Sequence, residues 1–408
     1  MRLGKLVLAG VGAIALAFAA TSAQAQKKYD EGASDTEIKI GHTNPYSGNA
    51  SAYGAIGKTI EAFLKKVNDD GGINGRKINF ITYDDGYSPP KTVEMVRKLV
   101  EEDKVLFLFN TLGTPSNTAI HKYMNAKKVP QLFVATGASK WGNPKDFPWT
   151  MGWQPDYATE GAIYAKHIMS TVKEPKIGVL MQNDDYGRDY FNGFKQGLGG
   201  DANKIVQVAT YEVTDPTVDS QLIQLKNSGA NVFFNITTPK FAAQAIKKAH
   251  EISWKPDAHY LNNVSSSFGA VFKPAGIEAS QGIVLALYRK DPADPQWVNA
   301  ADIKAWKEFM GKYMPQADLR DDGHNYAYSV ANTLVHALKN CGDNLTRENV
   351  MKQAASLKGY EAPMLLPGVK INTSATDFYP LQAVRLGRVK GESFELFGDV
   401  LSNEAPSQ

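Results

Sequence analysis

Residues 38–83 read IKIGHTNPYSGNASAYGAIGKTIEAFLKKVNDDGGINGRKINFITY. The apolar runs Ile38–Ile40 and Ile78–Tyr83, at the two ends of this segment, are typical of buried strands. Between them, the apolar side chains of Ile56–Asn68 repeat at helical spacing and fall on one face, and Gly71 then ends the helix. A strand, a helix and a second strand in this order predict parallel strands with the helix packed against their sheet.

The same alternation continues through the rest of the chain. Helical segments separate further apolar runs, so we predict an α/β fold with parallel sheets and helices on both faces. A length of 408 residues exceeds what one hydrophobic core usually supports, and we expect two lobes. No flexible Gly/Ser linker separates them, which favours a hinge that the chain crosses several times. The further predicted strands are Val105–Phe109, Gln131–Val134, Ile177–Met181, Val206–Val213, Val232–Ile236 and Gly282–Leu287.

The N-terminus has the layout of a secretory signal peptide. Arg2 and Lys5 precede the apolar run Leu6–Ala20, and Ala23–Ala25 supplies small residues for cleavage. The apolar run is shorter than the roughly 20 residues of a membrane span, which favours cleavage over an uncleaved anchor. We therefore expect residues 1–25 to be removed and the mature protein to be exported and soluble.

Composition narrows the class of protein further. Cys341 is the single cysteine, so an exported chain cannot form an internal disulfide and must be held together by its core. The net charge is +3, and removal of Arg2 and Lys5 leaves +1, a balance that points neither to nucleic acid nor to an anionic membrane surface. The seven histidines are scattered without metal-ligand spacing, and we expect no cofactor.

The sequence also lacks the usual motifs of enzymes. It contains no nucleophile elbow, no zinc-protease motif, no Cys-x-x-Cys and no dinucleotide fingerprint. Asp84 and Asp85 could form an acid pair, but adjacent residues of one loop rarely aim both carboxylates at one centre. A structural role for the two is favoured, because neighbouring ionised carboxylates repel each other. We therefore expect a binding protein and not an enzyme.

A series of motifs runs along the chain: Asn44–Gly48, Asn68–Lys77, Tyr83–Asp85, Thr136–Ser139 and Asp185–Gly187. In this order and at this spacing they resemble the type I periplasmic binding proteins of the branched-chain amino acid type, which are receptors of ABC importers. The resemblance covers the chain from about Thr36 to about Leu401. It implies an N-terminal lobe of residues 36–152 plus 288–364, a C-terminal lobe of residues 153–287 plus 365–401, and a ligand in the cleft between them.

Loops at the carboxyl ends of parallel strands are the places where open sheets bind ligands. Thr114 follows one predicted strand and is expected to cap a helix, whose free amides, with the hydroxyl of Thr114 or Ser116, would seat a carboxylate. An ordinary capped helix explains the same residues and is favoured by the sequence alone. His42, just after the first strand, either hydrogen-bonds a ligand in the cleft region or is packed there.

The resemblance implies further site residues. Ser139, with the neighbouring Ala138, matches the family position that supplies hydroxyl and amide donors to the ligand's carboxylate. Tyr53 and Tyr186 match aromatic positions on opposite walls of the cleft. Two such rings suit a planar or branched apolar body, although packing in a core explains a tyrosine equally well.

The positions at which this sequence differs from the family pattern are the basis for our hypothesis about the ligand. Amino-acid receptors of the family pair the ligand's ammonium with an acidic residue, but here the matching region, Tyr260–Ser265 around Asn263, contains neither Asp nor Glu. Thr238 and its neighbour stand where a family tyrosine would be. An ammonium buried without a countercharge costs several kcal/mol. We therefore infer a ligand that keeps the carboxylate and lacks the α-amino group, an aromatic acid of the hydroxybenzoate or hydroxycinnamate class.

Two alternatives stay open. A branched-chain or other hydrophobic amino acid is the ligand if the alignment shifts by a residue or two, or if Glu278 reaches the site. An amide-sensing regulator or a sensor would use the same fold for another task, but export and the absence of a fused DNA-binding or membrane segment favour transport. The resemblance thus implies a periplasmic protein, monomeric by default, that delivers a small carboxylate to the membrane permease of an ABC importer.

Overall fold

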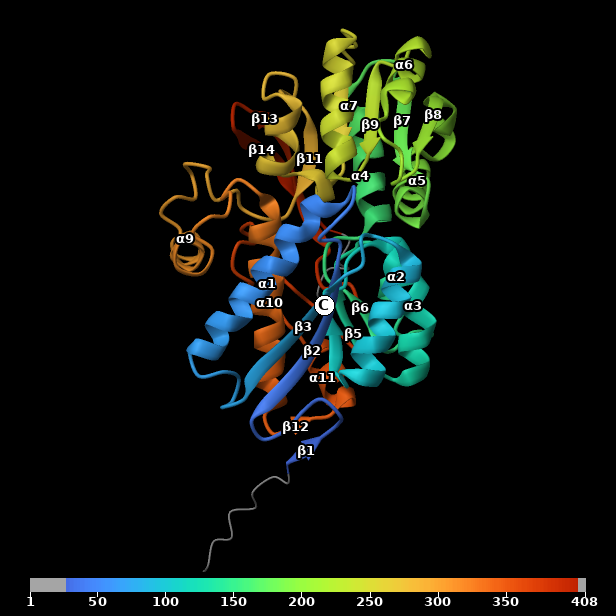
Figure 1. Cartoon of the computed structure of the whole chain (residues 1–408). Helices are drawn as coiled ribbons and strands as arrows, with labels where there is room; N and C mark the ends of the chain where they lie inside the picture. Colours follow the sequence, from blue (N-terminus) through green and yellow to red (C-terminus); the bar gives the residue numbers. More distant parts are fainter. Residues whose placement is uncertain (1–26, 403–408) are drawn as a thin grey trace, which may run out of the picture.

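A computed structural model describes residues 27–402 of the chain. The predicted signal peptide, residues 1–25, lies outside them. Two large sheets, one of five strands and one of seven, form the centres of two lobes. In Figure 1 the lobe with the five-stranded sheet lies below the lobe with the seven-stranded sheet. Each predicted strand overlaps an observed strand, which confirms the α/β class with two parallel-sheet lobes.

The five-stranded sheet is parallel throughout, with the order β3-β2-β4-β5-β6. Every residue of β4 and β5 is buried, as in strands that are covered on both faces. The strands are β2 (Glu37–Asn44), β3 (Lys77–Asp84), β4 (Phe107–Phe109), β5 (Gln131–Val134) and β6 (Thr150–Gly152). The helices of this lobe are α1 (Gly54–Asp69), α2 (Pro89–Arg97), α3 (Thr114–Lys127), α9 (Ala301–Tyr313), α10 (Asp322–Cys341) and α11 (Arg347–Ala354), of which α10 packs along α1.

The seven-stranded sheet has the order β14-β13-β11-β10-β9-β7-β8. Its strands are β7 (Ile177–Gln182), β8 (Ile205–Tyr211), β9 (Val232–Ile236), β10 (Ala258–Leu261), β11 (Val284–Leu287), β13 (Ala383–Lys390) and β14 (Ser393–Ser402). The helices beside it are α4 (Tyr157–Thr171), α5 (Asp185–Leu198), α6 (Asp219–Asn227), α7 (Pro239–Glu251) and the short α8 (Lys273–Ala275).

One edge of this sheet corrects the prediction of parallel strands. β13 runs antiparallel to β11, and β14 runs antiparallel to β13. Lys390 and Ser393 pair across a two-residue turn in which Gly391 has a φ of 60°. A tight turn of this kind joins antiparallel neighbours directly, whereas a parallel pair needs a long crossover connection.

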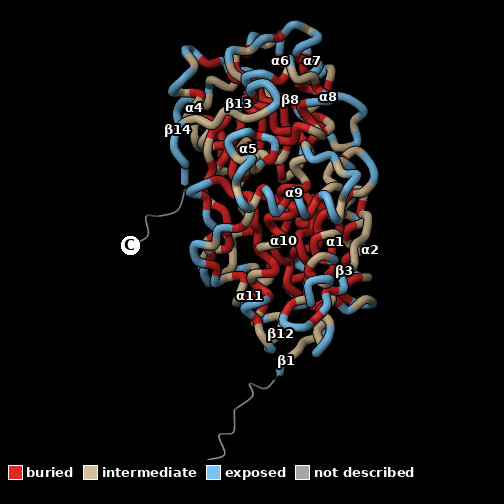
Figure 2. Tube along the Cα trace, turned by 90° about the vertical axis from the view of Figure 1, so that its left-hand side faces the viewer, coloured by how far each residue is buried: buried red, intermediate tan, exposed pale blue. Residues whose placement is uncertain are grey.

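The chain passes between the lobes at three places, as the hinge prediction requires. It leaves the first sheet after β6, returns from β11 to the helices that pack on α1, and crosses again before β13. Buried residues fill the interior of both lobes in Figure 2. One hydrophobic cluster contains side chains of both sheets, so the lobes share packed surface near the crossings.

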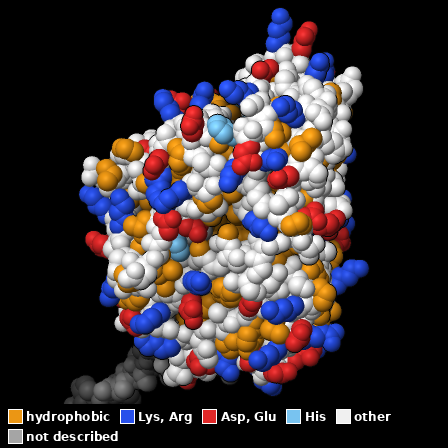
Figure 3. All heavy atoms as spheres, turned by 45° about the horizontal axis from the view of Figure 1, so that its top comes forward, with side chains coloured by type: hydrophobic (Ala, Val, Ile, Leu, Met, Phe, Trp, Pro, Cys, Tyr) orange, Lys and Arg blue, Asp and Glu red, His pale blue; other side chains and the backbone are white. Residues whose placement is uncertain are grey.

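The surface shows no field of a single sign on the face drawn in Figure 3, where Lys and Arg side chains alternate with Asp and Glu. This mixture agrees with the small net charge of +3. Within residues 27–402, no helix combines the length and the apolar character that crossing a membrane requires.

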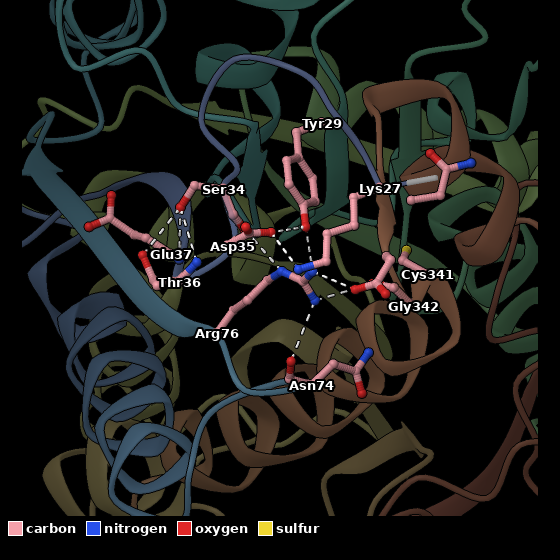
Figure 4. Close-up of polar contacts among 12 residues, drawn as sticks. Lys27, Tyr29, Ser34, Asp35, Thr36, Glu37, Asn74, Arg76, Cys341 and Gly342 are labelled. Carbon is pink, nitrogen blue, oxygen red and sulfur yellow. Dashed lines mark hydrogen bonds and ion pairs between the residues drawn. The ribbon is translucent and has the colours of Figure 1, made fainter. Parts of the chain in front are cut away.

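Arg76 ties the N-terminal segment to the end of α10 (Figure 4). Its side chain is only 3% exposed. The guanidinium donates to the Tyr29 hydroxyl at 2.6 Å, to the Ser34 carbonyl at 2.9 Å and to Asp343 at 2.6 Å. The segment that follows the predicted cleavage site is therefore part of the folded lobe, held by charge-assisted hydrogen bonds. β1 (Lys28–Tyr29) pairs with β12 (Asn344–Leu345) beside this cluster.

We expect Arg76→Met to lower the free energy of unfolding by about 2 kcal/mol, because it leaves polar partners of a buried guanidinium unpaired. Denaturant unfolding monitored by circular dichroism measures the loss. Lys27→Met, which removes an exposed cation bound to Asp35 in the same cluster, serves as the control and should change stability by less than about 0.5 kcal/mol. Equal stability of the two variants would contradict the role given to Arg76.

Candidate functional site

A cavity lies between the two lobes. Residues of both lobes and of the crossings line it, and the space among them measures about 710 Å³ when the part open to solvent is included. Six tyrosines from both lobes and from the crossings wall this central cavity: Tyr53, Tyr87, Tyr157, Tyr186, Tyr288 and Tyr326. Its walls are therefore flat and mostly apolar, with polar tips.

The tyrosines are fixed by their neighbours. Tyr157 and Tyr186 meet edge to face, with ring centroids 5.4 Å apart. Tyr87 needs Gly113 beside it, because a Cβ at that glycine would lie 2.6 Å from the Tyr87 ring, and the glycine has a φ of 100° that disfavours other residues. The Tyr53 hydroxyl donates to the Val264 carbonyl at 3.3 Å. The Tyr186 hydroxyl is buried without a hydrogen-bond partner among the described residues.

Arg289 is the cation of the cavity lining. Its guanidinium lies 4.1 Å from the Tyr288 ring centroid and 5.3 Å from that of Tyr326. Nη2 donates to the Asp322 carboxylate, and the side chain is 6% exposed. Cation–π contacts with two rings and one ion pair hold this arginine in place.

Two carboxylates at the start of α10 complete the polar part of the lining. Asp322 accepts from Arg289 and, at 3.2 Å, from the Ser266 hydroxyl. Asp321 caps α10 by accepting from the Gly323 amide at 2.9 Å, and it accepts from Ser267 at 3.3 Å. Burial raises the pKa of Asp321 to about 6.

Sequence reasoning missed Arg289 and both of these aspartates. Arg289 follows β11, so the rule that loops at carboxyl ends of parallel strands bind ligands already covered its position. From the sequence, that rule singles out only the loops near residues 114 and 139. Glu278, the acid considered from sequence, is exposed and does not line the cavity.

Five of the predicted site residues do line the central cavity: Tyr53, Thr114, Tyr186, Thr238 and Asn263. Thr114, however, is not a helix cap. Gly113 is the cap, α3 starts at Thr114 itself, and the threonine hydroxyl is hydrogen-bonded to that of Thr136 at 2.6 Å.

Three other predicted residues are packed away from the cavity. The Ser116 hydroxyl receives a hydrogen bond from Thr92 at 2.8 Å, and Ala138 is 2% exposed. His42 is fully buried, with Nδ1 2.8 Å from the Phe109 carbonyl, and burial lowers its pKa to about 4. β2 continues to Asn44, beyond the predicted end at Ile40, so His42 is part of the strand and lies inside the lobe.

Ser139 likewise faces a partner within the protein. Its hydroxyl and its amide donate to the Asp189 carboxylate of α5, at 2.6 and 2.9 Å. This pairing bridges the two lobes beside a second cavity, which Ser139 lines with Tyr379. A protein carboxylate thus occupies the donors that the family resemblance assigned to a ligand.

Asn263 lies between the central cavity and a buried acid. Its backbone N–H donates to Glu160 Oε1 at 2.8 Å, and its side-chain Nδ2 donates to Glu160 Oε2. Tyr164 and Tyr190 also donate to Glu160, at 2.7 and 2.8 Å. Burial raises the pKa of Glu160 to about 7. The cavity wall at this point is therefore a neutral amide, with the acid behind it and outside the lining.

Asp84 and Asp85 have the structural roles that we favoured. Asp84 accepts from the Tyr46 amide at 2.9 Å and the Ser47 hydroxyl at 2.6 Å, and Asp85 accepts from Thr92 at 2.8 Å. In the part of the chain that the structure describes, no group of three or more His, Cys, Asp or Glu side chains could hold a metal ion.

Comparison with known proteins places this geometry in a family. Residues 37–393 match the family model described as periplasmic binding protein. The Leu/Ile/Val-binding protein homolog 1 of Brucella abortus is 25% identical over 334 residues, 80% of this chain and 85% of that protein. A branched-chain amino acid ABC transporter protein of Thermus thermophilus, solved with bound valine, superposes with a TM-score of 0.81 at 16% identity, over 90% of this chain and 97% of that one. A solute-binding protein of R. palustris, solved in complex with benzoate, superposes with a TM-score of 0.75 at 21% identity. The match covers 90% of this chain and 98% of that one.

The environment of Glu160 predicts a pH effect on stability. The pKa of this carboxyl rises from 4.5 to about 7 on folding, so between these values the folded state binds more protons than the unfolded state. Stability therefore falls as the pH rises through this window, by up to about 1.4 kcal/mol per pH unit. Glu160→Gln, which cannot titrate, should lack this component when unfolding free energies are measured at pH 5, 6 and 7. Glu278→Gln, at an exposed carboxyl, is the control, and a Glu160→Gln profile parallel to that of the wild type would contradict the prediction.

Proposed function

The chain belongs to the periplasmic binding protein family, and from that membership we propose that it is a periplasmic receptor for a small aromatic carboxylate of the hydroxybenzoate or hydroxycinnamate class. It is the substrate-binding component of an ABC importer and does not catalyse a reaction. Its partners are the ligand and the membrane permease of the importer. The observation that carries the ligand proposal is the tyrosine wall of the central cavity.

Six tyrosine rings around one cavity favour a flat, unsaturated body over a compact aliphatic one. Burial of one ring supplies part of the roughly 8 kcal/mol that a micromolar ligand needs. The buried, unpaired Tyr186 hydroxyl suits a ring hydroxyl of the ligand, because an unpaired buried hydroxyl is costly. The benzoate bound to the R. palustris protein supports the same class of ligand.

An amino acid is the second candidate, and two observations favour it. Asp321 and Asp322 line the cavity and offer carboxylates to an ammonium group. Similar proteins are named as binding leucine, isoleucine or valine, or contain valine. We favour the aromatic acid because Asp322 is already paired with Arg289, Asp321 has a raised pKa, and the wall at Asn263 is neutral.

Binding would work by closure of the lobes. We propose residues 36–152 plus 288–364 and residues 153–287 plus 365–401 as the bodies that move. Contacts across the cleft define the closed arrangement: Asn49 donates to the Val213 carbonyl at 2.8 Å, and Lys240 donates to Asn49 at 2.9 Å. A ligand that touches both walls shifts the population toward this arrangement, which the permease then recognises.

Thermal unfolding of residues 26–408 separates the two candidates. The protein is unfolded, dialysed and refolded to remove endogenous ligand, and is then heated with benzoate, 4-hydroxybenzoate, 4-hydroxycinnamate, leucine or valine. At 100 times its Kd, a ligand adds about 2.7 kcal/mol of stability, and we expect such a rise in Tm with the aromatic acids alone. A rise with leucine or valine and none with the acids would contradict the ligand proposal and support the amino-acid candidate.

Tyr186→Phe tests the orientation of the ring. We expect the variant to bind 4-hydroxybenzoate about tenfold more weakly by calorimetry and to bind benzoate as the wild type does, because only the first has a hydroxyl to pair with Tyr186. Tyr123→Phe, on α3 outside the cavity, is the control with unchanged affinity for both. An equal loss for both acids would exclude a ring hydroxyl at Tyr186.

A further inference from the structure

Arg289 stands where the chain leaves β11 and crosses back toward the first lobe. Its side chain is buried, and its guanidinium contacts the rings of Tyr288 and Tyr326 and is part of the cavity lining. Its position at the crossings allows it to contact a ligand enclosed by both lobes.

The hydrogen bonds of Arg289 are incomplete. Nη2 is paired with Asp322, but Nε and Nη1 have no partner among the described residues. A guanidinium is charged at every physiological pH and carries five N–H donors. Donors of a buried charged group that lack an acceptor are costly, more so than those of a neutral group. These atoms therefore require an acceptor, and a carboxylate is the acceptor that matches a guanidinium best.

The alternative seats for a carboxylate are already filled by the protein. The hydroxyl and amide of Ser139 are bound to Asp189, and the hydroxyl of Thr114 is bound to Thr136. Arg289 is the lining residue that combines a full positive charge with unpaired donors. Its ion pair with Asp322 orients the guanidinium and leaves Nε and Nη1 unpaired.

We propose that Arg289 anchors the carboxylate of the transported ligand and that Asp322 is the positioning residue that holds the guanidinium in place. This inference rests on the proposed function as a receptor for a small carboxylate. It assigns the charged end of the ligand to the crossings, beside Tyr288 and Tyr326, and leaves Tyr53 and Tyr186 for the rest of the molecule.

Calorimetry with acids and their primary amides tests the proposal. The probes are benzoate, 4-hydroxybenzoate and 4-hydroxycinnamate, each paired with the amide that keeps the shape and lacks the charge. The wild type should bind the acid at least 100-fold more tightly than the amide. Arg289→Gln should lose that preference, so that acid and amide bind within about threefold of each other. A variant that keeps the wild-type ratio of acid to amide would overturn the role of Arg289.

Two further variants guard against a merely structural effect. Arg289→Gln combined with Asp322→Asn removes both charges, so that no unpaired carboxylate disturbs the fold, and it should show the same loss of preference. Arg320→Gln removes a guanidinium that stacks on Phe268 outside the central cavity, and it should keep the wild-type ratio. Loss of the acid preference in Arg320→Gln to the same extent as in Arg289→Gln would overturn the proposal.

The failure of the ligand proposal is distinguishable from the failure of this one. If the wild type binds leucine and none of the aromatic acids, the proposal of an aromatic ligand is wrong. The ratio of the affinities for leucine and leucinamide then tests the role of Arg289 in the same way. If the wild type prefers no carboxylate over its amide in any pair, the carboxylate anchor is overturned as well.

Discussion

The structure depends on one constraint of parallel sheets, which is that the loops at the carboxyl ends of their strands lie along a single edge. When these edges of the two sheets face each other, they enclose a space. The residues that line it come from segments far apart in the sequence. Thr114 follows β4, Thr238 follows β9, Asn263 follows β10 and Arg289 follows β11. The three crossings hold these edges opposite each other, so that residues of both lobes contribute to one site.

Within that space the chemistry is divided between rings and charges. The tyrosines provide apolar area at little cost in conformational entropy, and the buried charges lie beside the crossings, where both lobes contribute partners. A buried ion pair such as Arg289–Asp322 adds little net stability, which is consistent with a role in specificity. The carboxylates of Asp189 and Glu160, in contrast, accept hydrogen bonds from Ser139 and Asn263, so they stabilise the protein and do not contact a ligand in this account.

The sequence predicted what is encoded locally. Strands such as β5 and β9 are apolar throughout and were found from their composition, whereas β14 is half-buried or exposed along its length and has no such signal. The site was harder to predict because its pairings are distant in sequence. Ser139 is engaged by a residue 50 positions away and Arg289 by one 33 positions away. The hydroxyl of Ser139, in a glycine-containing loop, was therefore expected to be free for a ligand, and Arg289 was not among the predicted site residues.

A crystal structure of the protein grown with the aromatic acid that stabilises it most tests the central claim directly. The account predicts the ligand ring among the tyrosines of the central cavity, with its carboxylate within hydrogen-bonding distance of Nε or Nη1 of Arg289. A ligand whose carboxylate lies instead on Ser139, with Asp189 displaced, would contradict it.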